Sequence, residues 1–422
     1  MEVLLVADDL TGAVDAGHGF ARRGHRTVVA VSERDIAPDA DDPAVLAVNT
    51  DSRYAEDDDA REAVARALGG REARVVYKKV DSTLRGNVAS EVEAAIEASD
   101  ADLAVVAPAF PAAGRTTREG IHRVEGRRLS ETGYADDANP PGSDRLPALF
   151  EQARYPVEHV PLETVAEGVG AIHEVLESSG EGPRIATFDA ADDGHLATIA
   201  RAGGELGERV LYVGSGGLAA HIAVPERGVG VTGGAVGSPD GSGVLAVVGS
   251  VADATLAGIE RVPDSTVIEL DGEELVAEPE RVGRAAGERA AARLARGEHA
   301  LVTAARSRAD VAATRGAGAR AGHDENEVAA RVRRALAAAA GVALAEGRPS
   351  GLFLTGGDVA LAVCEEVGID AIRLSGEAVA EGVPCGRVAG GPLSGTPLVT
   401  KAGGFGGEST IVTVLGRLDG GS

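Results

Sequence analysis

The sequence predicts an α/β protein of two domains, each with a mostly parallel sheet flanked by helices, and with an active site in the cleft between them. Short apolar runs alternate with helical patterns along the chain. The chain has 422 residues, too many for one ordinary core. A stretch rich in Gly, Pro and Ser interrupts the alternation. We therefore expect an N-terminal domain over residues 1–224, a linker over 225–243 and a C-terminal domain over 244–422.

The first domain alternates strands and helices from its first residues onward. Short apolar runs predict strands, and apolar residues at helical spacing predict helices. The expected strands are 3–7, 27–31, 45–48, 74–79, 103–107, 184–188 and 209–213, and the expected helices are 13–23, 57–68, 88–98 and 192–202. This alternation is typical of parallel strands that are joined by right-handed crossovers, with helices on both faces of the sheet.

The same alternation resumes after residue 243. The expected strands are 244–248, 300–304, 352–355, 398–401 and 411–415, and the expected helices are 252–261, 278–295, 326–345 and 359–367. In open α/β sheets, ligands bind beyond the C-terminal ends of the strands. The conspicuous polar segments follow such ends, and they are 8–9, 81–87, 108–117, 249–250, 355–358 and 401–407. This agreement is the main argument for a site.

The composition is strongly acidic, with 66 Asp and Glu against 41 Lys and Arg. The acidic residues are spread along the chain, which favours a hydrated surface suited to strong salt over a patch for a basic partner. The absence of a basic stripe argues against nucleic-acid binding. No apolar run approaches the ~20 residues that span a bilayer, so no membrane contact is expected. The two cysteines form no CxxC pair, and a reduced, cytoplasmic protein is expected; assembly as a homo-oligomer is left open.

Only three lysines occur, and each lies beside a candidate catalytic segment. Lys78 and Lys79 precede the segment 81–87, and Lys401 opens a glycine-rich segment. An ammonium is a compact point charge, whereas a guanidinium is a planar fork. Lysines that are retained where arginine is otherwise preferred therefore indicate a site for phosphate or substrate.

Two carboxylates, Asp8 and Asp9, follow the first expected strand directly. Carboxylates in this place can accept a hydroxyl proton, bind hydroxyl groups or hold a hydrated Mg²⁺. The simpler alternative is helix capping, for which Asp is well suited. One Asp suffices for a cap, so the pair favours a function in the site. The nine histidines show no ligand spacing, and the sequence predicts no particular metal-binding residues.

The segment 81–87 gathers several kinds of polar group within one turn. Arg85 can form a bidentate pair with a carboxylate or a phosphate, and Ser82 and Asn87 can bind sugar hydroxyls. The simpler alternative is an ordinary loop with an ion pair between Asp81 and Arg85. The adjacent lysines favour a binding site.

The segment 108–120 gives a weaker signal. Arg115, next to two threonines, can bind an anion, but a loop rich in Pro and Gly is usually only a loop. His122 is expected to be structural. The segment 214–219 matches G-x-G-x-x-A, but the Gly/Pro stretch replaces the strand and acidic residue that a dinucleotide site needs, so NAD binding is rejected.

Three glycine-bearing turns follow strands in the C-terminal half. Such turns expose backbone N–H groups that can cradle phosphates, and a helix N-terminus adds to this effect. The residues expected to bind nucleotide are Ser250, Thr355, Gly356, Gly357, Asp358, Gly403 and Gly404. Each turn alone is a weak signal, but together with Lys401 they favour a nucleotide site.

Five blocks of this sequence resemble the four-carbon acid sugar kinase family. They are ADDLTGAVDAG, KKVDSTLRGN, PAFPAAGRTTREG, LFLTGGDVA and TKAGGFG, and they occur in the family's order over nearly the whole chain. The resemblance implies an acid-sugar-binding N-terminal domain and a nucleotide-binding C-terminal domain. It also implies ATP-dependent phosphorylation of an acid such as erythronate, threonate or a 3-oxo-tetronate.

On this hypothesis, Arg85 with Lys78 or Lys79 holds the substrate carboxylate. Asp8, Asp9 and Asp81 bind hydroxyls, and one of them takes or orients the attacking hydroxyl. Lys401 neutralises charge on the transferring phosphoryl group, and Mg²⁺ bridges the phosphates of ATP. Domain closure would exclude water.

The chain departs from the family in one turn, which usually reads GSxSxxTxxQ. Ala252 replaces the second serine and Gly258 replaces the glutamine, whereas Ser250 and Thr255 remain. Two other classes of protein therefore stay open. One is a non-catalytic sensor of an acid sugar and a nucleotide. The other is an aldolase or dehydrogenase that acts on the same acids.

Overall fold

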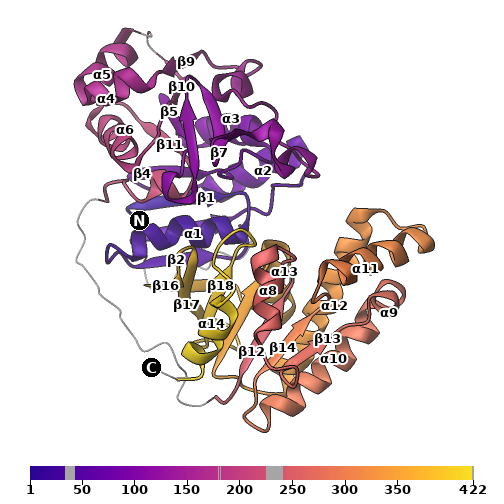
Figure 1. Cartoon of the computed structure of the whole chain (residues 1–422). Coiled ribbons are helices and arrows are strands. Elements are labelled where there is room, and N and C mark those ends of the chain that lie inside the picture. The colour runs from indigo at the N-terminus through magenta and orange to yellow at the C-terminus, as the bar shows by residue number, and fades with distance from the viewer. Residues whose placement is uncertain (34–42, 179, 181, 225–240, 421–422) are drawn as a thin grey trace. The chain divides into compact units, whose positions relative to one another are not determined.

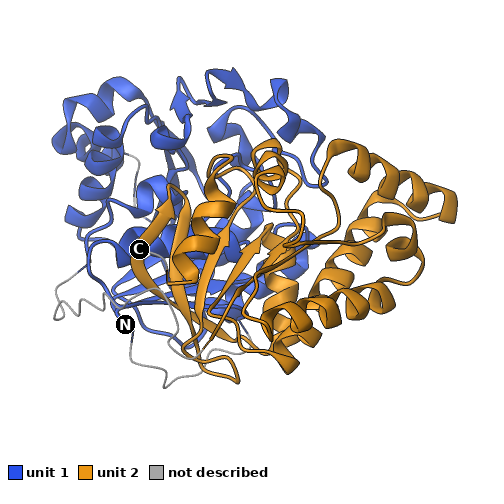
Figure 2. Ribbon diagram, turned by 60° about the horizontal axis from the view of Figure 1, so that its bottom comes forward, with its two compact units in different colours: residues 1–231 blue, residues 232–422 orange. Residues whose placement is uncertain are grey.

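The computed structural model describes residues 1–33, 43–178, 180, 182–224 and 241–420. It divides into two compact units, unit 1 (Met1–Val231) and unit 2 (Thr232–Ser422), which Figure 2 shows in different colours. The stretch that we expected as a linker, residues 225–243, lies outside the described residues except at its end. There the Gly243 carbonyl accepts a hydrogen bond of 2.7 Å from the Ser350 backbone N–H, so the chain is already part of unit 2.

Unit 1 is built on a sheet whose strands are all parallel (Figure 1). Its strands are β1 (Val3–Ala7), β2 (Thr27–Ala30), β3 (Val45–Asn49), β4 (Val75–Lys79), β5 (Leu103–Ala107), β9 (Val157–Val160), β10 (Arg184–Phe188) and β11 (Val210–Gly214). They lie in the order β2-β3-β1-β4-β11-β5-β10-β9. The residues of β1, β3 and β5 are all buried, because helices cover both faces of a parallel sheet.

The helices of unit 1 are α1 (Leu10–Ala21), α2 (Asp57–Leu68), α3 (Val88–Ser99), α4 (Leu162–Glu167), α5 (Val169–Ser178), α6 (Asp193–Glu205) and α7 (Gly216–Ala219). The chain leaves β1 toward β2 on one side and leaves β4 toward β5 on the other. Right-handed crossovers in opposite directions put α1 and α3 on opposite faces of the sheet. Accordingly α1 packs beside α7, and α2 packs beside α3. The ends of β1 and β4 therefore form a topological switch point, where α/β proteins bind ligands.

A small antiparallel sheet completes unit 1, and the sequence analysis did not predict it. It consists of β6 (Arg115–Arg118), β7 (Ile121–Val124) and β8 (Arg127–Arg128). The short helices η1 (Pro111–Ala113), η2 (Leu129–Glu131), η3 (Gly133–Asp136) and η4 (Leu146–Phe150) flank it. His122 is fully buried in this sheet and its Nε2 lies 2.9 Å from the Ser82 carbonyl oxygen. This contact fits the structural role expected for His122.

Unit 2 contains a mixed sheet in the order β13-β14-β12-β15-β18-β17-β16. The strands are β12 (Val244–Val248), β13 (Val267–Glu269), β14 (Ala300–Thr303), β15 (Gly351–Thr355), β16 (Ala371–Ala380), β17 (Val383–Ala389) and β18 (Pro397–Lys401). The pairs from β13 to β18 are parallel, whereas β17 is antiparallel to both β18 and β16. The α/β prediction, with mostly parallel sheets, is confirmed, although this antiparallel hairpin was not anticipated.

The helices of unit 2 are α8 (Asp253–Glu260), α9 (Gly272–Ala277), α10 (Pro279–Leu294), α11 (Arg308–Ala321), α12 (Glu325–Glu346), α13 (Gly357–Val367) and α14 (Thr410–Leu418). The helix that follows β12, α8, packs beside α14, whereas the helix that follows β15, α13, packs beside α12. The adjacent ends of β12 and β15 are therefore the switch point of unit 2.

One predicted strand, residues 411–415, is wrong, because these residues lie in α14. The buried residues Ile411, Val414, Leu415 and Leu418 recur at the spacing of one helical face and pack into the core of unit 2. A short apolar run alone cannot distinguish a strand from the buried face of a helix. Among the helices that the structure describes, none combines the length and the apolar character that a bilayer span requires.

The helices α10 and α12 pack with their backbones in close approach. A Cβ atom added to Gly283 of α10 would lie 2.2 Å from the Ala335 carbonyl oxygen of α12. One turn later, a Cβ added to Gly287 would lie 2.6 Å from the Ala339 carbonyl oxygen. Glycine on one helix and alanine on the other thus set the distance between the two helix axes.

We predict that Gly283→Ala destabilises the protein although alanine is the better helix former. The methyl group must push α10 away from α12, which costs about 1–3 kcal/mol and exceeds the gain in helix propensity. Gly416→Ala is the matched control, because Gly416 lies in α14 with no atom within 4 Å of the added Cβ. Differential scanning calorimetry should show a lower unfolding midpoint for Gly283→Ala and an equal or higher one for Gly416→Ala. Equal midpoints for both variants would contradict this account of the packing.

Candidate active site

The switch point of unit 1 is organised around one guanidinium, that of Arg53. Its Nε lies 2.7 Å from Asp8 Oδ2, and its Nη2 lies 2.8 Å from Asp9 Oδ1 and 4.0 Å from Asp81 Oδ1. Asp8 and Asp9 follow β1, Arg53 follows β3, and Asp81 follows β4. Three strand ends therefore meet in one ionic cluster, as their adjacent positions in the sheet require.

The sequence analysis brought the three carboxylates forward and missed Arg53. The segment Asp51-Ser52-Arg53 follows the third strand in the same way as the chosen polar segments follow theirs. Applying the strand-end rule to that strand as well would have found the arginine.

Arg53 determines the ionisation of this cluster. Burial acts to raise the pKa of Asp9, but Arg53 and Lys79 hold it below its ordinary value. Burial acts on Asp81 in the same direction, yet Arg53 and Arg85 hold the pKa of Asp81 far below its usual range. The arginine in turn has its pKa raised by Asp8, Asp9 and Asp81 against the effect of burial. Asp9 and Asp81 are thus ionised throughout the neutral range.

Asp9 has the capping role that we weighed as the simpler alternative, and it also binds Arg53. It is the N-cap of α1, because its Oδ1 accepts a hydrogen bond of 2.8 Å from the Gly12 backbone N–H. Its Oδ2 accepts hydrogen bonds from Thr11 Oγ1 at 2.7 Å and from Arg53 Nη1 at 2.9 Å. Asp8 takes no part in the cap and faces Arg53, so the two adjacent carboxylates have different partners.

Arg85 also lies at this switch point, with several partners of its own. Its Nε donates a hydrogen bond of 2.7 Å to Asp81 Oδ2, and its Nη1 donates one of 3.0 Å to Asp137 Oδ2. The guanidinium carbon lies 5.3 Å from the centre of the Tyr134 ring. The Asp81–Arg85 ion pair that we weighed as the simpler alternative is therefore present, within the same cluster as the candidate site.

Lys78 and Lys79 belong to opposite faces of the sheet, because successive residues of a strand alternate. Lys78 is fully buried and its Nζ lies 3.0 Å from Glu91 Oε2 of α3. Lys79 Nζ donates to the Val80 carbonyl oxygen at 2.9 Å and lies 3.0 Å from the place of a Cβ on Gly12 of α1. Lys79 thus lies on the side of Asp9.

The remaining candidates in unit 1 support the loops around Arg53. Asn87 donates hydrogen bonds of 2.9 Å to the carbonyl oxygens of Ser52 and Ala55, so its amide ties two strand-end loops together. Arg115 donates to the Ala113 carbonyl oxygen and to the Tyr134 hydroxyl, the latter at 3.4 Å.

Ser82 lies beside Asp81, and its backbone is held by His122. Its side chain is partly exposed.

The switch point of unit 2 brings three turns together. The Gly249 N–H donates to the Thr355 carbonyl oxygen at 2.9 Å, and the Gly356 N–H donates to the Lys401 carbonyl oxygen at 3.1 Å. Gly356 has a φ of 91°, and a Cβ on it would lie 3.1 Å from the Ser250 backbone nitrogen. The turns after β12, β15 and β18 therefore lie against one another through their backbones.

Lys401 lies among these turns as a buried cation. Its Nζ donates a hydrogen bond of 2.8 Å to Thr255 Oγ1, which lies 3.3 Å from Ser250 Oγ. In the part of the chain that the structure describes, no carboxylate lies within ion-pair distance of this ammonium. Burial lowers the pKa of Lys401 to about 8. A buried ammonium without a counter-ion, next to glycine-rich turns, is typical of a site that receives an anion.

The other residues expected in the nucleotide site differ in their surroundings. Gly357 and Asp358 open α13, and the exposed Asp358 lies 3.4 Å from Arg333. A Cβ on Gly403 would lie 3.1 Å from Ser250 Oγ, whereas Gly404 has no atom within 4 Å of such a position.

The departure at position 258 has a packing explanation. A Cβ on Gly258 would lie 3.2 Å from the Glu408 carbonyl oxygen and 3.2 Å from Ile411 Cδ1. Helix α8 thus lies close to the start of α14, and a side chain at position 258 would require α14 to shift by a few tenths of an ångström. The other departure, Ala252, is the N-cap residue of α8, and its N–H donates to Ser250 Oγ at 3.3 Å.

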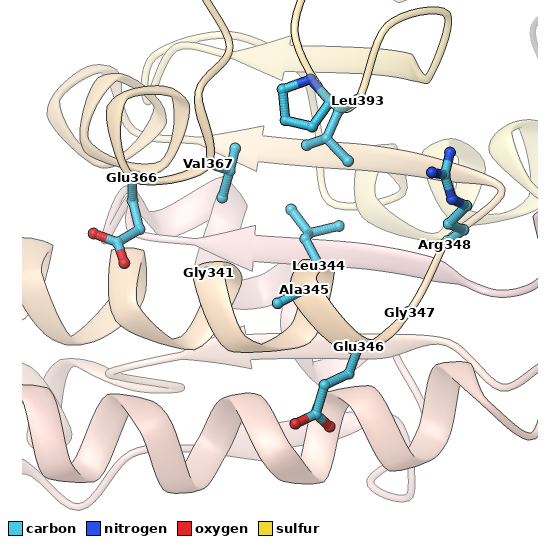
Figure 3. Close-up of a pocket in the computed structure, with 10 residues that line it drawn as sticks. Gly341, Leu344, Ala345, Glu346, Gly347, Arg348, Glu366, Val367 and Leu393 are labelled. Atoms are coloured by element: carbon cyan, nitrogen blue, oxygen red, sulfur yellow. The ribbon is translucent and has the colours of Figure 1, made fainter.

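A hollow of about 500 Å³ in unit 2 lies elsewhere (Figure 3). The residues that line it are Gly341, Leu344, Ala345, Glu346, Gly347, Arg348, Glu366, Val367, Pro392 and Leu393. They belong to the C-terminal ends of α12 and α13 and to the loop before β18, at the edge of the sheet where β15 and β18 begin. The hollow therefore lies at the N-terminal ends of these strands. Lys401 lies at the C-terminal end of β18, so the hollow takes no part in the site.

The fold and the two switch-point sites define a two-domain α/β protein with one mainly anionic, arginine-bound cluster and one cationic, glycine-rich site. Residues 3–222 match the family of sugar-binding N-terminal domains, and residues 245–411 match the family of nucleotide-binding C-terminal domains. The chain belongs to the four-carbon acid sugar kinase family, as the sequence blocks indicated.

Curated relatives cover nearly the whole chain. The D-threonate kinase of Salmonella typhimurium is 34% identical, with 98% of each chain covered. The D-erythronate kinase of Heliobacterium modesticaldum is 32% identical, covering 99% of this chain and 97% of its own. The 3-oxo-tetronate kinase of Methylobacterium radiotolerans is 33% identical, covering 95% and 96%. A crystal structure described as a putative tRNA synthase from Salmonella typhimurium LT2 has a TM-score of 0.78 at 22% identity over 98% of each chain, which supports the fold alone.

We predict that Arg53→Ala lowers stability most at neutral pH. In the wild type, carboxyls with lowered pKa values stabilise the fold above about pH 4, and this contribution is lost as the pH falls through their folded pKa values. Without Arg53, Asp9 and Asp81 lose the positive charge that opposes the effect of burial, and their pKa values rise. The variant should therefore lose about 3–5 kcal/mol at pH 7.5 and less at pH 5.

The measurement is the free energy of unfolding in denaturant at both pH values, with Arg118→Ala as the control. Arg118 is an exposed arginine at the end of β6, and its replacement should leave the free energy of unfolding unchanged. A loss for Arg53→Ala that is equal at both pH values would contradict the ionic role of this residue.

Proposed function

We propose that this protein is an ATP-dependent kinase that transfers the γ-phosphoryl group to a hydroxyl of a four-carbon sugar acid, such as threonate, erythronate or a 3-oxo-tetronate. Relatives named as kinases of these acids support the proposal. The match of the two halves to sugar-binding and nucleotide-binding domains supports it as well. The two cysteines are free and buried, which fits a reducing, cytoplasmic setting.

The observation that carries the proposal is the unpaired ammonium of Lys401 at the switch point of the nucleotide-binding half. In our proposal the phosphates of ATP rest on the turns that carry Ser250, Thr355, Gly356, Gly357, Gly403 and Gly404, with Asp358 at their edge. Lys401 then gains a counter-charge that none of the described residues supplies. In phosphoryl transfer, positioning and charge neutralisation provide most of the catalysis, so a cation in this place has a direct role.

In unit 1 we assign the sugar acid to the Arg53 cluster. Arg85 and Lys79 bind the substrate carboxylate, since Arg85 is partly exposed and Lys79 makes no ion pair among the described residues. Asp8, Asp9, Asp81 and Ser82 bind hydroxyls, and Arg115 supports Tyr134 beneath Arg85. Lys78 and Asn87 position the loops, because their polar atoms are already bound to Glu91 and to backbone carbonyls.

Mg²⁺ is expected to enter with ATP and to neutralise charge on its phosphates. Within the described ranges no group of three or more His, Cys, Asp or Glu side chains is arranged to hold a metal ion. Asp9 and Asp81 are neutralised by Arg53 and Arg85, which fits a metal bound mainly through the phosphates. The reaction also requires a phosphate bound by unit 2 to reach a hydroxyl bound by unit 1, and this joint action is part of the proposal.

The two alternatives explain less. An aldolase or dehydrogenase would use the carboxylates of unit 1 but would leave Lys401 and the glycine turns without a role. A sensor would bind both ligands without turnover, and the altered positions 252 and 258 first suggested it. Gly258 packs closely against α14, so glycine at this position also fits the packing of two helices.

We predict ADP release with at least one four-carbon sugar acid. A coupled assay in molar salt, over a panel of threonate, erythronate and 3-oxo-tetronate stereoisomers, measures this release directly. ADP release that depends on one acid supports the kinase. Thermal stabilisation by acid and ATP without ADP would support the sensor, and NADH-coupled turnover without ATP would support the dehydrogenase. Either of these outcomes rejects the proposal.

We predict that the charge of Lys401 sets the alkaline limit of activity. Its ammonium is present below about pH 8 and is lost as the pH rises through that value, so kcat/KM for ATP should fall above about pH 8. Lys401→Met should lower kcat/KM by about 10²–10³ and remove this alkaline limb. Lys401→Arg should keep part of the activity and also lack the limb, because arginine stays protonated. Arg289→Ala, an exposed change on α10, is the control, and an unchanged limb in Lys401→Arg would exclude Lys401 as its source.

A further inference from the structure

One carboxylate near the Arg53 cluster has no hydrogen-bond or ion-pair partner among the residues that the structure describes, and it was not singled out from the sequence. Asp15 lies in the second turn of α1, three residues after Gly12, so both belong to the same face of that helix. The side chain of Asp15 is partly buried. Over the described ranges, no hydrogen bond or ion pair involves its carboxylate. In this respect Asp15 differs from Asp8, Asp9 and Asp81, which Arg53 or Arg85 neutralise.

The carboxylate of Asp15 packs directly against Gly216, the first residue of α7, which follows β11. A Cβ on Gly216 would lie only 2.5 Å from Asp15 Oδ2, so any side chain there would displace the carboxylate. A Cβ on Gly12 would lie 3.0 Å from Lys79 Nζ and would separate this ammonium from α1. The sequence analysis left the G-S-G-G turn after β11 without a function once NAD binding was rejected. The absence of a side chain at Gly216 of this turn allows Asp15 to lie beside the C-terminal end of β11.

The charged groups that face Asp15 come from α1 and β4. Asp9 of α1 and Lys79 of β4 act on it electrostatically, and Asp15 in turn acts on Tyr77 of β4. The Tyr77 hydroxyl donates a hydrogen bond of 2.5 Å to the Ser215 carbonyl oxygen. The short helix α7, which begins at Gly216, and Phe110, which lies against Gly216, add no charge.

Burial, reinforced by Asp9 and opposed by Lys79, raises the pKa of Asp15 to about 6. In the neighbouring cluster, Arg53 together with Lys79 or Arg85 lowers the pKa values of Asp9 and Asp81. Carboxylates whose pKa values are driven apart in one site commonly divide the roles of charge and proton transfer. A general base works best with a pKa near the working pH, and Asp15 meets this condition.

We propose that Asp15 accepts the proton of the substrate hydroxyl that attacks the γ-phosphorus of ATP. This inference rests on the proposed kinase function and assigns the base within the same site. The hydroxyl O–H bond breaks and its proton passes to an Asp15 carboxylate oxygen, while the hydroxyl oxygen forms the new bond to phosphorus. The bond from the γ-phosphorus to the bridging oxygen breaks, and its electron pair leaves with ADP. Asp15 then returns the proton to water, so that the enzyme is restored. The positive charge of Lys79 acts to lower the pKa of Asp15 and so favours the ionised carboxylate that can accept the proton.

The test is Asp15→Asn in the full-length protein, assayed with the acid that gives ADP in the panel. We expect kcat to fall by about 10²-fold or more, with the KM values for ATP and acid changed by less than about threefold. The wild type should lose kcat/KM as the pH falls below about 6, because Asp15 becomes protonated, and the residual activity of Asp15→Asn should lack this limb.

Stability separates catalysis from a structural role. A carboxyl whose folded pKa is raised destabilises the fold above its unfolded pKa, so Asp15→Asn should unfold at the same or a higher temperature at pH 7.5. A structural role would instead lower both activity and stability. Asp100→Asn is the matched control, because Asp100 caps α3 with a φ of 51°, a conformation that Asn also tolerates.

The two proposals fail in different ways. An active wild type, with Asp15→Asn above a third of its kcat and the acidic limb retained, rejects Asp15 as the base and leaves the kinase intact. A wild type that releases no ADP with any acid of the panel rejects the kinase and this inference together.

Discussion

The contact between Arg53 and three carboxylates is the constraint on which unit 1 depends. Three strand ends deliver Asp8, Asp9 and Asp81 to one place, and their negative charges could not be buried together without a cation. A planar guanidinium can bind two carboxylates edge-on and approach the third, which an ammonium cannot do with the same geometry. The cluster therefore fixes the relative positions of the loops after β1, β3 and β4. Arg85, Asn87 and Lys79 lie around the loops that this ion network holds together.

The two switch-point sites differ in how the charges of their side chains are balanced. In unit 1 the chain provides both the anions and the cations, so most charges are balanced before any ligand arrives. In unit 2 it provides the cation Lys401 and backbone N–H groups, and leaves the anion to a ligand. This difference is what a kinase of small acids needs, because a neutral hydroxyl must be oriented in one place and a highly charged triphosphate must be bound in the other. Glycine is essential at Gly249 and Gly356, since a side chain would push the turns apart; a Cβ on Gly249, for example, would lie 2.2 Å from Val359 Cγ2.

Local pattern was sufficient for the α/β class, for most strands and helices, and for the segments that carry the sites. It failed where the outcome depends on contacts between distant residues. The apolar residues of 411–415 are compatible with a strand or with a helix, and their packing in the core of unit 2 favours the helix. The contacts of Asn87 with Ser52 and Ala55 come from another loop and could not be read from its own segment, whereas its role in sugar binding stays a prediction. Asp15 lies inside a helix, where a single Asp gives no signal. Its carboxylate packs against Gly216, which follows it by some two hundred residues. The hairpin of β16 and β17 lies where the alternation of strands and helices offers no guide.

The most direct test of the whole account is a crystal structure of the protein with a four-carbon sugar acid and a non-hydrolysable ATP analogue. We predict that the acid lies against the Arg53 cluster, with its carboxylate on Arg85 or Lys79. We also predict that the triphosphate lies on the turns that carry Ser250 and Gly356, with an oxygen atom on Lys401 Nζ. A triphosphate bound to the arginines of unit 1, or an acid bound only in unit 2, would contradict the division of labour on which the account is built.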